Sequence, residues 1–221
     1  GYGITVGNAL RRVLLSSLPG AAVSAVKING IQHEYDSLEH VKEDVVEIMM
    51  NLKKLRVTIH SDEPVVLQLN VKGEKEVTAG DIKKDSQVEI ANKDLVIATL
   101  TDKKAEISME ITVKKGIGYE PVEERVVDKK DIGALQIDSM FSPVVNVGFN
   151  VENVRVGQRT DYEKIVLDVT TDGSMPAESA VTTAVGIIQE QFSAIASTEP
   201  EIKEKRKKRS TKASVEAEAD T

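Results

Sequence analysis

The sequence contains no cysteine and few aromatic residues, and both absences narrow the kinds of protein it can be. Without cysteine there is no disulfide framework and no cysteine-bound zinc site. The three histidines are too few and too scattered for a histidine-rich metal centre, so we expect no metal and no other cofactor. Aromatic residues make up only 3% of the chain, which argues against recognition of single-stranded nucleic acid by base stacking.

Long apolar runs are also missing. No segment approaches the roughly 18 consecutive apolar residues that a membrane-spanning helix needs. No signal peptide opens the chain, so we expect a cytoplasmic protein with no membrane partner. A length of 221 residues allows one or two domains with a substantial core.

Charge is distributed unevenly along the chain. The segment from Thr198 to Thr221 carries seven basic and six acidic residues, so its net charge is +1. Because the whole chain has a net charge of −7, residues 1–197 carry −8. A net-negative body releases few counterions from DNA, so we expect little or no direct DNA binding by the folded part. We expect residues 197–221 to form a charged flexible tail, whose basic run Lys203–Arg209 is either a phosphate contact or a solvated linker.

The first half of the chain mixes helical and strand patterns. Apolar residues at helical spacing predict a first helix with one apolar side, formed by Val6, Leu10, Val13, Leu14 and Ser17. A strand is expected over residues 22–28, and the Asn29-Gly30 turn predicts a hairpin into residues 31–35. A second helix is expected over about Val41–Lys53, with one face made by Val45, Ile48, Met49 and Leu52.

The second half is rich in strands and ends in a helix. Alternating apolar residues predict strands over Val65–Val71 and Ile107–Val113, each with one buried face. A strand pair is expected at about 144–155 and 162–170. The last helix is opened by Ser174-Met-Pro176, and its apolar side comprises Val181, Ala184, Val185, Ile188, Phe192 and Ile195. Periodicity alone leaves open whether this side packs on the preceding strand or is exposed for a partner.

The three glycines at the start of the chain, Gly1, Gly3 and Gly7, admit more than one interpretation. Glycine followed by a helix can cradle a phosphate. Here the third glycine comes one residue too late for Gly-x-Gly-x-x-Gly, no strand precedes it, and no Gly-Lys-Ser/Thr follows. The other interpretation is a close approach of the chain into an amphipathic helix that carries the pair Arg11-Arg12.

The densest group of titratable residues lies before and within the second predicted helix, at Asp36, Glu39, His40, Glu43 and Asp44. Its spacing matches no EF-hand loop, and His33-Glu34 is not followed by the second histidine of His-Glu-x-x-His. We therefore interpret these side chains as solvated groups near a helix N-terminus, and we expect no catalytic residue and no metal site.

Three stretches together resemble one family. Residues 1–17 are similar to the alpha motif of bacterial RNA polymerase alpha subunits. Gly30–Tyr35 with Val41–Lys53 resembles that family's second signature, and Ser142–Asp161 resembles its return into the first subdomain. The matches follow the family's order and span about residues 1–195, so we identify the chain as a member of this family.

The resemblance implies an α+β fold with two subdomains. A discontinuous dimerisation subdomain is expected from residues 1–20 and 145–196, and an inserted strand-rich subdomain from residues 21–144. The family's strands that precede this region are not in the sequence, and after Ala196 too few residues remain for its DNA-contacting C-terminal domain.

The resemblance also implies a function. It predicts a homodimeric scaffold that nucleates assembly of RNA polymerase by binding the beta and beta-prime subunits in DNA-templated transcription. The chain would then be a non-catalytic subunit of a nucleotidyltransferase, cytoplasmic and associated with the nucleoid through the polymerase. The alternative is an unrelated homodimeric protein-binding module without a polymerase role.

Contact residues are carried over from the family position by position. The beta subunit is expected to contact Arg11, Arg12 and Leu15, and arginine suits this role because its planar fork makes several charge-assisted hydrogen bonds. Glu47 and Lys53 match positions associated with beta-prime. The dimer interface is expected to contain apolar residues of the first and last helices: Val6, Leu10, Val13, Leu14, Val181, Val185, Ile188 and Phe192.

Overall fold

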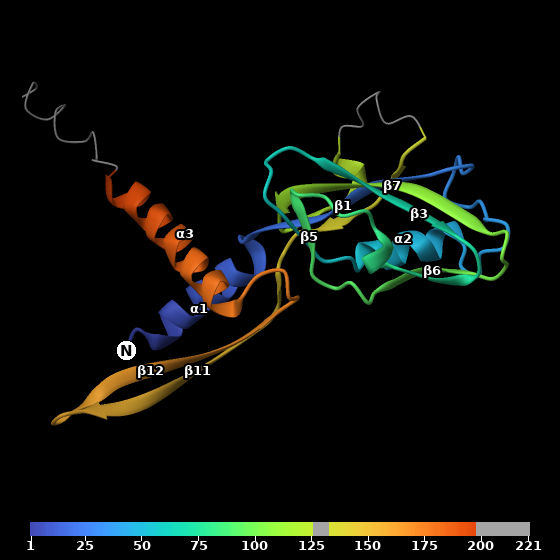
Figure 1. Ribbon diagram of the computed structural model, residues 1–221. Helices are drawn as coiled ribbons and strands as arrows, with labels where there is room; N and C mark the ends of the chain where they lie inside the picture. Colours follow the sequence, from blue (N-terminus) through green and yellow to red (C-terminus); the bar gives the residue numbers. More distant parts are fainter. Residues whose placement is uncertain (126–132, 198–221) are drawn as a thin grey trace, which may run out of the picture. The chain divides into compact units, whose positions relative to one another are not determined.

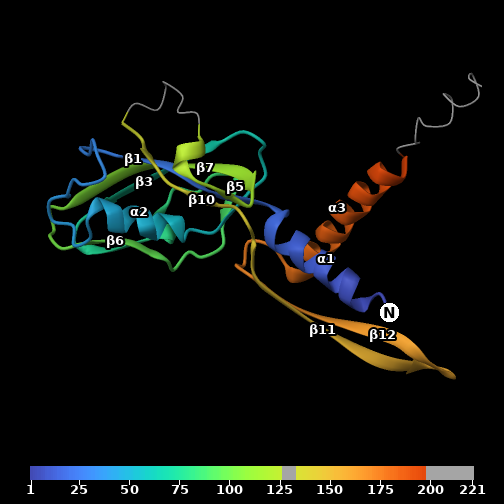
Figure 2. The same ribbon diagram turned by 180° about the vertical axis from the view of Figure 1, so that it is seen from behind.

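The computed structural model describes residues 1–125 and 133–197, so the basic run Lys203–Arg209 and the expected tail beyond Ser197 lie outside the described residues. Figures 1 and 2 show an α+β chain, as predicted. Its helices are α1 (Gly3–Ser16), α2 (Val45–Lys53) and α3 (Ala177–Ser197), with short 3-10 turns η1 (Ala79–Asp81) and η2 (Val122–Glu124). Its strands are β1 (Pro19–Ile28), β2 (Val57–Ile59), β3 (Val65–Lys72), β4 (Lys75–Thr78), β5 (Val88–Ile90), β6 (Val96–Leu100), β7 (Glu106–Ile117), β8 (Tyr119–Glu120), β9 (Leu135–Gln136), β10 (Ser139–Met140), β11 (Val144–Val156) and β12 (Arg159–Thr171).

The largest sheet has the strand order β3-β7-β1-β9, and its pairs are antiparallel. The two alternating strands predicted from the sequence are β3 and β7, and they pair with each other, Leu69 opposite Met109. Alternate residues of both strands are buried, which confirms their single buried face. The core beside them is almost entirely aliphatic, as the low aromatic content requires.

The second helix covers this core. Val45, Ile48 and Leu52 of α2 are fully buried in it. The helix begins at Val45 and not at Val41, because the Asp44 side chain caps it by accepting a hydrogen bond from the Glu47 N–H at 2.7 Å. Val41 instead forms an isolated bridge with Leu100.

The hairpin expected from Asn29-Gly30 is absent. Gly30 does adopt a positive φ of 86°, as a turn requires, but residues 31–35 form no strand. Both edges of β1 are taken by strands distant in sequence, β7 and β9. The returning segment therefore finds no free edge to pair with.

The predicted strand pair at 144–155 and 162–170 is confirmed as the long hairpin β11–β12, which turns at Gly157. Helix α1 packs on this hairpin, mainly on β11 (Figure 1). By its contacts the chain forms one unit from Gly1 to Val185 and a second from Gly186 onward, so the boundary falls inside α3. The subdomain boundaries expected at 20/21 and 144/145 remain predictions.

Candidate functional site

The glycines of the first helix allow it to lie close against the hairpin. A Cβ on Gly3 would lie 2.6 Å from Cγ1 of Val151, and one on Gly7 would lie 2.5 Å from Cδ2 of Phe149. The Gly3 N–H donates a 2.6 Å hydrogen bond to the carboxylate of Glu163 on β12. The helix N-terminus, which could have received a phosphate, therefore already holds a carboxylate of the same chain. The glycines serve close packing.

Packing on the hairpin sorts the α1 residues into one buried side and two open flanks. Gly3, Gly7, Leu10 and Leu14 form the buried side. With about 3.6 residues per turn, Val6 and Val13 lie on one flank, whereas Arg11 and Leu15 lie on the other. Two partners can therefore contact the helix from different sides.

The expected beta-contact residues lie on the open surface of α1. Arg11 and Arg12 are exposed, and neither forms an ion pair with any residue that the structure describes. Leu15 is half-buried, and its carbonyl accepts a 3.3 Å hydrogen bond from the Ser142 hydroxyl. The helix thus presents two arginines beside one aliphatic side chain, and arginine is one of the residue types enriched in protein-binding hot spots.

The expected dimer residues differ in how much surface they offer. Leu14 is fully buried within the single chain and Leu10 is 9% exposed, so neither has appreciable surface for a second copy. Val6 is 44% exposed and Val13 is half-buried. The assignment of α1 to a dimer interface therefore depends on Val6 and Val13, which lie on a flank and not on the buried side.

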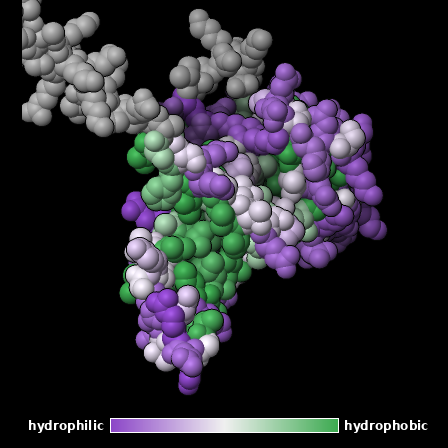
Figure 3. All heavy atoms as spheres, turned by 90° about the vertical axis from the view of Figure 1, so that its left-hand side faces the viewer, coloured by the Kyte–Doolittle hydropathy of each residue, from purple (hydrophilic) through white to green (hydrophobic). Residues whose placement is uncertain are grey.

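The last helix also has two kinds of apolar surface. Ala180 and Ala184 are fully buried, whereas Val185 and Phe192 are 46% and 65% exposed. Val181 and Ile188 are half-buried. Figure 3 views the side of the molecule that carries α1 and the hairpin and shows apolar residues gathered there. Exposed apolar residues that recur along one helix face are characteristic of a binding surface.

The two residues matched to beta-prime contacts lie on α2, six positions apart. Both are exposed, and no hydrogen bond or ion pair joins them. Glu47 lies in the first helical turn, and Lys53 is the last helical residue, roughly 9 Å away along the axis at 1.5 Å per residue. They can contact one partner only if its surface runs along the helix.

Lys53 belongs to a cluster that the sequence did not reveal. Its Nζ lies 3.1 Å from Oδ2 of Asp138 and 5.6 Å from the ring centroid of Tyr119. The other oxygen of Asp138 accepts the Val122 N–H at 3.1 Å. The Val122 hydrogen bond and then Lys53 hold the pKa of Asp138 below its ordinary value. Asp138 follows Lys53 by 85 residues in the sequence, so no local pattern could have joined them.

The acidic group around the start of α2 has structural roles that the sequence interpretation missed. The Glu43 carboxylate accepts the Thr99 N–H at 2.6 Å and the Thr99 hydroxyl at 2.8 Å. Asp44 caps α2, and Asp36 accepts hydrogen bonds from the backbone N–H groups of Gln32 and His33. These side chains were expected to be only solvated, but each accepts hydrogen bonds that hold the neighbouring backbone in place. In the described ranges, no group of three or more His, Cys, Asp or Glu side chains could hold a metal ion.

The helices of the described residues include none that is long and apolar enough to cross a membrane.

Comparisons with known proteins identify relatives over most of the chain. Residues 26–142 match the family model described as the RNA polymerase Rpb3/RpoA insert domain. The chain is 51% identical over 192 residues to the DNA-directed RNA polymerase subunit alpha of Symbiobacterium thermophilum, covering 87% of this chain and 61% of that protein. The subunits of the same name from Alkaliphilus oremlandii and Oceanobacillus iheyensis are each 50% identical over 192 residues, covering 60% and 61% of their lengths. The chain therefore spans about three fifths of the length of these relatives.

Proposed function

The chain belongs to the DNA-directed RNA polymerase alpha-subunit family, and from this membership we propose that it is a non-catalytic, homodimeric scaffold for polymerase assembly. In this proposal two copies associate through α1 and α3 and then bind the beta and beta-prime subunits in the cytoplasm. The folded part has little direct contact with DNA. The discontinuous dimerisation subdomain, 1–20 and 145–196, and the inserted subdomain, 21–144, are parts of the same proposal.

The observation that carries the proposal is the division of α1 into two open flanks. One flank offers the apolar residues Val6 and Val13, which suit a second copy of the chain. The other offers Arg11 and Leu15, and Arg12 lies beside them on the face opposite the buried side. These residues suit a larger partner with carboxylates or carbonyls. A two-fold dimer would leave one arginine flank open on each copy, so a larger partner can still bind after dimerisation.

The dimer proposal is also supported by α3. Val185 and Phe192 lie seven residues apart, and both are exposed in the single chain. Burying these side chains against a second copy would remove apolar surface from water at about 25 cal/mol per Å². The alternative of an unrelated homodimeric module would use the same apolar surface but would have no use for Arg12.

The test is capture of the beta subunit by an Arg12→Ala variant. The arginine is exposed, so its removal should leave folding and dimerisation intact. We expect the dissociation constant for beta to rise by about 30-fold, corresponding to roughly 2 kcal/mol for a hot-spot residue. Arg155→Ala is the control, because Arg155 is an exposed arginine on β11 that is not assigned to the contact. Equal affinity of Arg12→Ala and the parent would remove the beta-contact assignment.

Affinity purification distinguishes the two functions. The tagged chain, expressed in a bacterium and purified with its partners, should yield the large polymerase subunits by mass spectrometry. Recovery of a dimer without any polymerase subunit would favour the unrelated binding module.

A further inference from the structure

A hollow of about 360 Å³ opens beside β5 and shares no residue with the surfaces proposed above. Its floor is aliphatic: Leu67, Ala79 and Ile82 are buried there, and Val88 and Ile90 are half-buried. A space of this size accommodates one or two side chains of a partner. Because the floor is apolar, the first requirement for an occupant is an aliphatic group.

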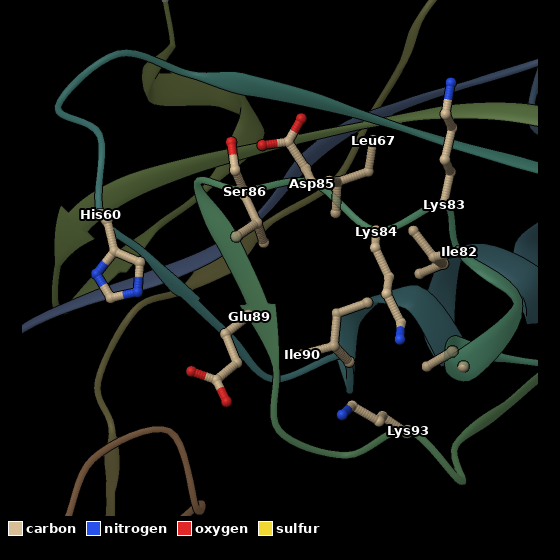
Figure 4. A pocket seen from close by; sticks show the side chains of 13 residues that line it. His60, Leu67, Ile82, Lys83, Lys84, Asp85, Ser86, Glu89, Ile90 and Lys93 are labelled. Carbon is tan, nitrogen blue, oxygen red and sulfur yellow. The ribbon is translucent and has the colours of Figure 1, made fainter.

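The rim of the hollow carries three lysines against two carboxylates, those of Asp85 and Glu89. Lys83, Lys84 and Lys93 line it, and none of the three forms an ion pair with any residue in the described ranges. Figure 4 shows Lys84 and Lys93 on the same side of β5 as Ile90, whereas the Glu89 carboxylate points to the other side. The lysines therefore remain available for an anion.

Backbone hydrogen bonds hold both sides of the rim in place. The Lys83 N–H donates to the Gln68 carbonyl on β3 at 2.8 Å, which fixes the loop that carries Lys84. The Gly80 N–H donates to the Lys93 carbonyl at 2.9 Å, which fixes the opposite loop to η1. Since the backbone is already ordered, a ligand would have to immobilise only the lysine side chains.

We propose that this hollow binds an acidic peptide segment of a partner protein, with an aliphatic side chain on the floor and carboxylates against Lys84 and Lys93. The aliphatic floor favours a peptide over nucleic acid, since a base has no aromatic ring or arginine to stack on except His60 at the edge. The net charge of −8 on residues 1–197 also opposes binding of a long polyanion. A short segment whose few charges lie next to the lysines avoids this repulsion.

The sequence alone does not reveal this site. Lys83 and Lys84 are adjacent in the segment between η1 and β5, and Lys93 lies in the loop after β5. In the sequence each one is therefore interpreted as an ordinary solvated charge. Only folding places them around the residues of β3, η1 and β5.

The test uses the full chain and a short fluorescent peptide in which glutamate and leucine alternate. We expect saturable binding, weakened about tenfold or more when Lys84→Glu and Lys93→Glu are combined, because like charges then face each other. Lys104→Glu is the matched control, since Lys104 is exposed in the turn between β6 and β7 and does not line the hollow. A peptide with glutamine in place of glutamate should bind at least about tenfold more weakly to the parent.

A competition experiment and a direct map decide between the outcomes. Amide NMR shifts caused by the peptide should fall on residues 79–93, and a single-stranded oligonucleotide should not displace the peptide. Undetectable peptide binding, or equal binding by the double variant and the parent, would overturn the proposal. Tighter binding of the oligonucleotide, lost in the double variant, would assign the hollow to nucleic acid instead. None of these experiments uses polymerase subunits, so a failure of this proposal would not contradict the proposed scaffold function.

Discussion

Gly7 of α1 lies directly against the ring of Phe149 on β11, and a Cβ at this position would be 2.5 Å from Cδ2 of that ring. The distance is shorter than any ordinary carbon–carbon contact. The first helix can therefore approach the hairpin only because this side chain is missing. The orientation of both α1 flanks, and with it the proposed subunit contacts, depends on this pair.

Gly7→Ala should destabilise the fold. Overpacking against Phe149 costs about 1–3 kcal/mol, which outweighs the roughly 1 kcal/mol that alanine gains over glycine in a helix. Gly186→Ala in α3 is the matched control, because a Cβ there meets nothing within 4 Å and should be neutral or stabilising. Urea unfolding of both variants measures the difference. An equal midpoint for the two would show that the Phe149 ring yields without cost.

Val185→Glu should convert a dimer into a monomer without unfolding it. Val185 is 46% exposed in the single chain, so a carboxylate is hydrated in the monomer but would be buried unpaired in the proposed interface. Val66→Glu is the control, since Val66 is 52% exposed on β3 outside that interface. Light scattering gives the molecular mass of each variant. A dimer of unchanged stability for Val185→Glu would exclude this part of α3 from the interface.

Leu14 does not provide an equally clean test. It is fully buried in the subunit, so Leu14→Asp should lower the stability of the monomer itself. Loss of the dimer in that variant would say nothing about where the interface lies. The sequence pattern could not separate Leu14 from Val13, because both fit an apolar helical stripe, and only the position of β11 decides which one is covered.

The same limit explains what the sequence could and could not predict. Alternation along β3 and β7 was enough to predict two strands with one buried face, and the hairpin β11–β12 was found in the same way. The prediction of a hairpin after Asn29-Gly30 was wrong because β1 pairs with β7, which is distant in the sequence. A local turn signal carries no information about such long-range pairing. Local patterns therefore predicted the elements better than their partners.

The candidate site divides similarly. Family resemblance selected Arg12 and Lys53, whose contact roles remain predictions. It did not indicate the ion pair of Lys53 with Asp138, since 85 residues separate the two. Glu43 and Asp44 were interpreted as solvated charges, yet one hydrogen-bonds Thr99 and the other caps a helix. The roles of these side chains depend on partners that are fixed only in the folded chain.

Asp138 should make stability depend on pH in the acid range. The Val122 N–H and Lys53 lower its pKa in the folded state, so its contribution is fully present above the unfolded pKa and is lost as the pH falls through the folded pKa. Since Asp138 is 35% exposed, the contribution is at most about 1 kcal/mol. Asp138→Asn should lower the urea midpoint at neutral pH and have little effect near about pH 2. The same loss at both pH values would mean that its charge is not involved.

Arg125 should be a principal structural residue of the strand-rich region, although nothing in the sequence distinguishes it. Its side chain is 8% exposed and donates hydrogen bonds to the Ser24 carbonyl at 2.8 Å, the Ser139 hydroxyl at 2.6 Å and the Glu120 carbonyl at 3.2 Å. These bonds join β1, β8 and β10. Arg125→Met keeps much of the volume but removes all three hydrogen bonds that the guanidinium donates, although the Ser24 carbonyl still accepts the Ile137 N–H at 2.9 Å.

We expect Arg125→Met to cost at least about 2 kcal/mol of unfolding free energy, because several hydrogen bonds from a charged donor are lost in a buried setting. Arg155→Met, at an exposed arginine of β11, should change stability by less than about 0.5 kcal/mol. Arg125→Lys should recover little of the loss, since one ammonium group cannot reach three acceptors in the geometry of a planar guanidinium. Chemical denaturation of the three variants is the measurement. Full rescue by lysine would show that the positive charge, and not the hydrogen-bond geometry, holds these strands together.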